Sequence, residues 1–174
     1  GQRIGEPQGF VSAPIHASVS GKVVKIGLYD HPLGNPVKAV FIENDGQDTL
    51  DEGVKPSKSL AELTPPEIIQ IAKEAGLVGL GGAAFPTHVK LSPPEDIAID
   101  TVIINAAECE PFLTADHALM LERADDVLYG LKAFMKALQA TKGIIGIEDN
   151  KPDAIAVMQK TVAENSQDYD IEVH

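Results

Sequence analysis

The sequence predicts an α/β protein in two parts, a small β unit over residues 1–50 and a parallel-sheet α/β unit over residues 60–174. In the first part, short β-branched runs are separated by Gly and Pro, which is typical of short strands and turns. In the second part, apolar residues at helical spacing alternate with β-branched runs, and this alternation favours a parallel sheet. The charge changes near the same boundary, from 4 basic and 5 acidic residues before residue 51 to 10 basic and 21 acidic residues after it.

The β unit is expected to form short strands, at residues 9–11, 23–26 and 37–42. Residues 12–26 resemble the barrel-sandwich hairpins of biotinyl and lipoyl carrier domains, in which the modified lysine lies at an exposed hairpin tip. In those domains the lysine stands in a Met-Lys-Met or Asp-Lys-Ala tripeptide. Neither tripeptide is present here, and Lys22 and Lys25 instead fall within an expected strand. We therefore predict a barrel-sandwich-like domain with unmodified lysines, followed by a polar linker over residues 51–59.

The α/β unit opens with a helix whose two ends are both marked in the sequence. Thr64 and Glu67 form a capping box around Pro65, and Gly76 is a good helix stop. Two helices are expected within residues 114–141, meeting near Arg123, and Asn150 is expected to cap another. The expected strands are residues 101–105, 143–147 and 169–173. Because the last strand coincides with the end of the sequence, we expect the sheet to be incomplete and the chain to be a piece of a longer protein.

Composition excludes several classes of function. The chain has 174 residues, of which 44% are hydrophobic, and this is a globular composition. A net charge of −12 argues against binding to nucleic acid or to an anionic membrane surface, and no segment approaches the roughly 18 apolar residues of a membrane span. With Cys109 as the single cysteine, the chain has no internal disulfide or cysteine-held iron–sulfur cluster, and His88 and His117 lack the spacing partners of a metal site.

A glycine loop, here residues 76–90, carries the first chemical signal. It has four glycines in its first seven residues. Gly79, Gly81 and Ala84 match the dinucleotide fingerprint, but they follow a helix, whereas the fingerprint follows a strand. Such a loop can instead bring backbone N–H groups close to a flat or anionic ligand, with Lys90 as the nearby cation. The alternative is a tight structural connection.

An acidic loop, residues 105–111, carries the second signal. It begins where the strand at 101–105 ends, and open α/β sheets bind ligands at the carboxyl ends of their strands. Asn105 can donate and accept hydrogen bonds, and repulsion between Glu108 and Glu110 would raise one pKa if they were buried. The alternative is a solvated acidic turn. Cys109 is expected to be a small buried residue, not a nucleophile.

The two loops, with the segment 147–152 (Ile-Glu-Asp-Asn-Lys-Pro), resemble the C subunit of the Rnf ion-translocating electron-transport complex over essentially the whole chain. They resemble more distantly the flavin-carrying, NADH-binding subunit of respiratory complex I. Its loops read Gly-Arg-Gly-Gly-Ala-Gly-Phe-Pro-Thr and Asn-Ala-Asp-Glu-Gly-Glu-Pro. The resemblance implies a Rossmann-like FMN-binding-type domain. The residues that would cradle FMN are Gly79, Gly81, Gly82, Lys90 and Asn105, and those that would line the NADH side are Glu108 and Glu110. This sequence departs from the complex I pattern at Leu80, Ala84, Ala107 and Cys109.

The resemblance also implies a function for the longer protein. It would pass electrons from NADH through FMN to iron–sulfur clusters held in a part absent from this chain, coupled to ion translocation by the whole complex. It would lie peripherally on the cytoplasmic side of the membrane, with the other subunits as partners. No residue here is assigned a catalytic role, and this chain is expected to hold only part of the FMN site and to bind FMN weakly or not at all. The alternative is a non-catalytic docking or scaffold domain whose glycine loop is structural.

Overall fold

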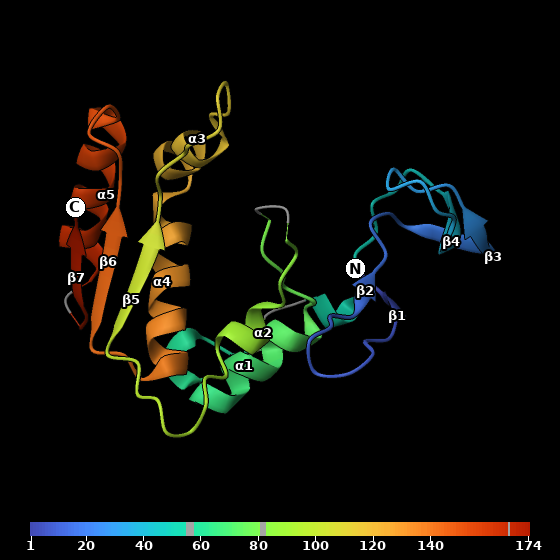
Figure 1. Cartoon of the computed structure of the whole chain (residues 1–174), viewed down its shortest axis with the longest axis horizontal. Coiled ribbons are helices and arrows are strands. Elements are labelled where there is room, and N and C mark those ends of the chain that lie inside the picture. Colours follow the sequence, from blue (N-terminus) through green and yellow to red (C-terminus); the bar gives the residue numbers. More distant parts are fainter. Residues whose placement is uncertain (55–57, 81–82, 167) are drawn as a thin grey trace. The chain divides into compact units, whose positions relative to one another are not determined.

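The computed structural model describes residues 1–54, 58–80, 83–166 and 168–174 (Figure 1). The chain divides into two compact units. The first comprises Gly1–Ser59 and Ile71–Val89, and the second comprises Leu60–Gln70 and Lys90–His174. A mixed α/β fold with a small N-terminal β region and a parallel sheet is therefore confirmed.

The first unit contains two small antiparallel sheets. β1 (Arg3–Gly5) pairs with β2 (Ile15–His16), and β3 (Gly21–Tyr29) pairs with β4 (Val37–Asn44) in a hairpin. Lys22 and Lys25 both lie within β3, as expected, away from the hairpin tip. The strand expected at residues 9–11 is absent. Gly9 has a φ of 83°, and the Gln8 amide donates to the Ser12 hydroxyl at 3.0 Å, so this segment bends.

The segment around the first helix shows both predicted helix ends. In α1 (Pro65–Glu74), the Glu67 carboxylate accepts hydrogen bonds from the backbone amide of Thr64 at 2.8 Å and from its hydroxyl at 2.7 Å. Gly76 follows the helix with a φ of 67°, and a Cβ there would lie 2.7 Å from the carbonyl oxygen of Pro14. Glycine is therefore required on both conformational and steric grounds. The short helices of this region are η1 (Glu52–Val54), η2 (Leu60–Glu62) and α2 (Thr87–Lys90).

The second unit is built on a three-stranded parallel sheet in the order β5–β6–β7 (Figure 1). Its strands are β5 (Thr101–Asn105), β6 (Lys142–Gly146) and β7 (Asp170–Val173). Its helices are α3 (Ala115–Glu122), α4 (Ala124–Leu138) and α5 (Pro152–Asn165). The three predicted strands and their parallel arrangement are confirmed. The predicted junction of two helices near Arg123 is also confirmed, because this residue ends α3 and precedes α4.

One face of the sheet forms the core of this unit. Ile145 on β6, Leu131 and Met135 on α4, and Met158 on α5 are essentially inaccessible to solvent. Gly143 on β6 lets α4 approach the sheet closely, since a Cβ there would lie 2.8 Å from the sulfur of Met135. These contacts fix the helices against the strands, and the strands fix where the following loops emerge.

The start of α5 differs from the prediction. The cap residue is Lys151, not Asn150, and no side chain caps the helix. The backbone N–H of Lys151 donates to the carbonyl of Glu148 at 3.0 Å, which closes a turn over residues 148–151. Pro152 then fixes φ at the first helical position. Lys151 therefore lies between this turn and the helix, and its side chain makes the contacts described below.

Candidate functional site

Two loops emerge side by side at the carboxyl edge of the parallel sheet. Asn105, the last residue of β5, pairs in register with Gly146, the last residue of β6. The Ala106 amide extends this pairing by donating to the Gly146 carbonyl at 2.9 Å. The acidic loop and the 148–151 turn therefore begin from neighbouring points, at the edge where open α/β sheets bind ligands.

Asn105 is exposed at the base of the acidic loop. Its Oδ1 accepts a hydrogen bond from the Ala107 amide at 3.1 Å, which turns the chain away from the strand. Its NH2 group makes no hydrogen bond within the described part of the chain. The side chain therefore retains donors for a ligand while its oxygen holds the loop.

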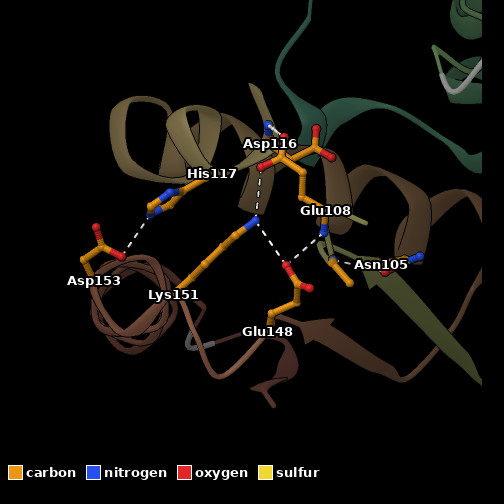
Figure 2. Close-up of polar contacts among 8 residues, drawn as sticks. Asn105, Glu108, Asp116, His117, Glu148, Lys151 and Asp153 are labelled. Atoms are coloured by element: carbon orange, nitrogen blue, oxygen red, sulfur yellow. Dashed lines mark hydrogen bonds and ion pairs between the residues drawn. The ribbon is translucent and has the colours of Figure 1, made fainter. Parts of the chain in front are cut away.

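Glu108 points into the molecule. Its side chain is only 4% exposed, Oε1 accepts the Asp116 amide at 2.9 Å, and Oε2 lies 3.1 Å from the Lys151 ammonium. Its own amide donates to the Glu148 carboxylate at 3.3 Å. Figure 2 shows these groups converging from the acidic loop, the start of α3 and the turn before α5.

Lys151 joins the two carboxylates. Its Nζ lies 3.1 Å from Glu108 and 3.2 Å from Glu148, and its side chain is 13% exposed (Figure 2). We refer to Glu108, Glu148 and Lys151 as the Lys151 cluster. Burial disfavours the charged ammonium, but the hydrogen bonds and charge attraction of the two carboxylates outweigh it and raise the pKa of Lys151.

The Glu108 carboxyl has a pKa below its usual value, chiefly because it accepts the Asp116 amide and secondly because Lys151 lies beside it. The expectation that repulsion from Glu110 would raise the pKa of a buried glutamate is therefore wrong for Glu108. The partners of its buried carboxylate are a backbone amide at 2.9 Å and a cation at 3.1 Å. The carboxylate is stabilised in its charged form.

A second contact joins the same two helices. His117 on α3 lies 2.9 Å from the carboxylate of Asp153 on α5 (Figure 2). This hydrogen bond is the main reason why the pKa of Asp153 is lowered. The starts of α3 and α5 are thus held together at two points.

The remaining predicted residues of the second unit are exposed. The side chains of Glu110 and Lys90 face solvent, and within the described residues neither forms an ion pair. Cys109 is also exposed, so the expectation of a buried cysteine is wrong. It is the neighbouring Glu108, with its charge partners, that turns inward.

The glycine loop folds back on itself within the first unit. Val78 and Pro86 form an antiparallel bridge, and the Gly79 amide donates to the Phe85 carbonyl at 2.9 Å. Ala84 has a φ of 48°, a conformation that favours glycine. Gly81 and Gly82 lie outside the described residues. The predicted flavin residues thus fall in both units, Gly79 in the first and Lys90 and Asn105 in the second.

Sequence reasoning did not single out Lys151 or Glu148. The available signal was the position of the two loops, which follow neighbouring strands, one with two glutamates and one with a lysine. Within the described residues, no group of three His, Cys, Asp or Glu side chains could hold a metal ion. No helix in the same part of the chain is long and apolar enough to cross a membrane.

Two family models match the chain. One is described as the Nuo51 FMN-binding domain and covers residues 72–174, which include both loops. The other is described as the RnfC barrel sandwich hybrid domain and covers residues 1–47.

Relatives match along most of the chain. The C subunit of the Na(+)-translocating ferredoxin:NAD(+) oxidoreductase complex of Acetobacterium woodii is 52% identical over 96% of this chain. The C subunit of the ion-translocating oxidoreductase complex of Pseudomonas aeruginosa is 41% identical over 94% of it. The chain spans 38% and 21% of the lengths of these two relatives. A solved NAD+-reducing NiFe hydrogenase in the air-oxidized state shares the fold with a TM-score of 0.51 at 23% identity, over 70% of this chain and 23% of that chain.

The fold and the first match define a class, α/β proteins with an FMN-binding domain of the Nuo51 type. Within it, the chain belongs to the RnfC family, the C subunits of the Rnf ion-translocating electron-transport complex.

Proposed function

We propose that the chain is part of a membrane-associated, NADH-linked electron-transfer subunit that passes electrons from NADH through FMN to iron–sulfur clusters, coupled to ion translocation by the whole complex. The match of the FMN-binding domain to residues 72–174 carries this proposal. The other subunits of the complex would be its partners, and it would lie peripherally on the cytoplasmic side of the membrane. Iron–sulfur clusters need cysteines, so we assign them to the part of the relatives' length that this chain does not cover.

We assign residues 1–50 to a barrel-sandwich-like β domain, residues 51–59 to a linker, and residues 60–174 to an incomplete α/β domain like that of the complex I flavoprotein. Within the last, Gly79, Gly81, Gly82, Lys90 and Asn105 would hold FMN. Two observations fit this group. The Asn105 NH2 retains its donors and the exposed Lys90 ammonium has no ion-pair partner among the described residues, so both remain available for polar flavin or phosphate oxygens.

Bound FMN would supply hydride acceptance and one-electron release. The contribution of this chain would be binding, orientation and charge. Gly79 would act by allowing close approach of the backbone, since its amide already donates to Phe85. The acidic loop, with Glu108 and Glu110, would face NADH.

A docking or scaffold domain is the second candidate. The observation that favours it is the Gly79–Phe85 hydrogen bond, because it gives the glycine loop an internal structural role. The two candidates differ in whether the full-length protein carries flavin that NADH can reduce.

The test is flavin absorbance of the purified full-length protein, followed by bleaching on addition of NADH. We expect the protein to show flavin absorbance and to lose it when NADH is added. We also expect the Gly81→Val variant to lack flavin, because a branched side chain would block close approach of the backbone to the flavin. Isothermal titration of the 174-residue chain with FMN should show weak binding or none. Full-length protein without flavin, or normal flavin content in Gly81→Val, would contradict the assignment.

A further inference from the structure

We propose that Lys151 is a positioning residue, which holds Glu108 inward and so sets the path of the acidic loop, leaving Glu110 as the carboxylate that meets the ligand. This inference rests on the proposed function, in which the acidic loop faces NADH. The sequence alone does not distinguish the two glutamates of the loop. In this proposal Glu108 is buried and fixes the loop, whereas Glu110 is exposed and contacts the ligand.

The first support is the convergence of elements on one ammonium group. Lys151 lies at the start of α5, Glu108 in the loop after β5, and Glu148 in the turn after β6. The Glu108 carboxylate also accepts the Asp116 amide at the start of α3. Removing the Lys151 ammonium would therefore affect the acidic loop and both helix starts together.

The second support is the contrast between the two glutamates. Both oxygens of Glu108 are engaged, one with the Asp116 amide and one with Lys151, and the side chain is almost inaccessible. Glu110 is exposed and has no ion-pair partner among the described residues. A ligand hydroxyl can reach Glu110 directly, whereas reaching Glu108 would require opening a nearly closed ion pair.

The third support is the charge balance. Glu108 and Glu148 are brought together by the 3.3 Å contact between the Glu108 amide and the Glu148 carboxylate. Without the Lys151 charge, two buried or half-buried carboxylates would repel each other at the base of the loop. The loop would then relax outward, and the position of Glu110 would change with it.

The experiment is a double-mutant cycle in the full-length protein, with Glu108→Gln, Lys151→Met and the two combined. In Glu108→Gln, the new side-chain amide oxygen would still accept the Asp116 amide, but the side chain would carry no charge. Lys151→Met leaves the buried Glu108 charge without its cation, whereas Glu108→Gln leaves Lys151 paired with Glu148, and the combined change removes both charges of the Glu108–Lys151 pair. Lys160→Met is the matched control, because Lys160 lies on the same helix, is 74% exposed and pairs with Glu164 only at 3.9 Å.

We expect Lys151→Met to raise the KM for NADH about 10-fold to 100-fold, with kcat and flavin content much less affected, because loss of one hydrogen bond between the Glu110 carboxylate and the ligand, made equally before and during the reaction, has an effect of this size. The double variant should recover most of the loss, and Lys160→Met should match the wild type. A double variant no better than Lys151→Met alone would overturn the inference, because removal of the Glu108 charge would then not relieve the loss of the ammonium. A Glu108→Gln variant with a KM raised as far as that of Lys151→Met would show that Glu108 itself contacts the ligand. A wild-type KM in Lys151→Met would also overturn the inference.

Amide hydrogen exchange in the same variants separates this inference from the proposed function. If wild-type flavin is not bleached by NADH, the proposed function fails and kinetics cannot be read. The positioning role of Lys151 still predicts that the Asp116 amide loses its protection from hydrogen exchange in Lys151→Met and regains it in the double variant. Unchanged protection in Lys151→Met would overturn the positioning role by itself.

Discussion

The Glu108 carboxylate accepts the backbone amide of Asp116 at 2.9 Å, and so caps α3 from eight residues away. Thr114, the residue directly before this helix, makes no capping hydrogen bond with its side chain. A helix start carries unpaired amides and a partial positive charge, both of which favour a carboxylate. Glu108 therefore links the order of the acidic loop to the stability of α3.

This link predicts a pH-dependent stability. The pKa of Glu108 in the folded chain lies below its ordinary value of 4.5. The Glu108 charge therefore stabilises the folded state fully at pH values above 4.5, and this stabilisation is lost as the pH falls through the folded-state pKa. We expect wild type to melt above Glu108→Gln at pH 7, and the difference to shrink on acidification to pH about 3. Thermal melts of both proteins across this range are the measurement.

Glu110→Gln is the control for that experiment, since this exposed side chain has no ion-pair partner among the described residues. Its melting temperature should stay close to that of the wild type at every pH. A difference between wild type and Glu108→Gln that stays constant or grows on acidification would contradict the role assigned to the Glu108 charge.

Close packing of α4 on the sheet predicts that Gly143→Ala destabilises the protein. The new methyl group would meet the Met135 sulfur at 2.8 Å, Ile171 at 3.1 Å and Leu131 at 3.2 Å. Overpacking of this kind costs about 1–3 kcal/mol in the free energy of unfolding. Gly146→Ala, on the same strand, is the matched control, because its nearest contact would be an ordinary 3.9 Å. Equal urea-unfolding midpoints for the two variants would refute the packing argument.

The positive φ of Ala84 predicts that glycine is the better residue there. Ala84→Gly should raise the free energy of unfolding by about 0.5–1 kcal/mol, since it relieves a left-handed conformation that costs an L-residue about that much or more. Ala98→Gly is the control, because Ala98 is exposed outside the helices and strands, has no positive φ, and gains only chain entropy in the unfolded state. Chemical denaturation measures the free energy of unfolding of both variants. The prediction fails if Ala98→Gly is the more stable of the two.

Lys22 and Lys25 are predicted to carry no lipoyl or biotinyl group. Both lie within β3, and the Lys25 ammonium lies 5.1 Å from the centre of the Phe41 ring, where a cation–π contact holds it against the hairpin. Intact-mass measurement on protein from its native source should give the mass expected from the sequence at both positions. An adduct on either lysine would show that the domain acts as a carrier.

Local patterns predicted the elements of the fold well, whereas the site depends on a pairing that local patterns do not contain. The capping box at Thr64 and the break at Arg123 are marked by neighbouring residues. The contact of Lys151 with Glu108 joins residues 43 apart and exists because β5 and β6 pair in parallel register. That long-range contact also explains the wrong predictions nearby. Once Glu108 turns inward, Cys109 is left exposed, and the pKa of Glu108 is lowered by its new partners instead of being raised by Glu110.

The strand order β5–β6–β7 has a consequence for how the sheet assembles. β6 pairs with a strand on each side, and the segment between β6 and β7 is shorter than that between β5 and β6. Closing the shorter loop costs less chain entropy, so refolding from denaturant should begin with β6, α5 and β7. A ribosome delivers β5 before any of these elements. During synthesis, β5 emerges first and has no partner in its sheet until β6 has followed it.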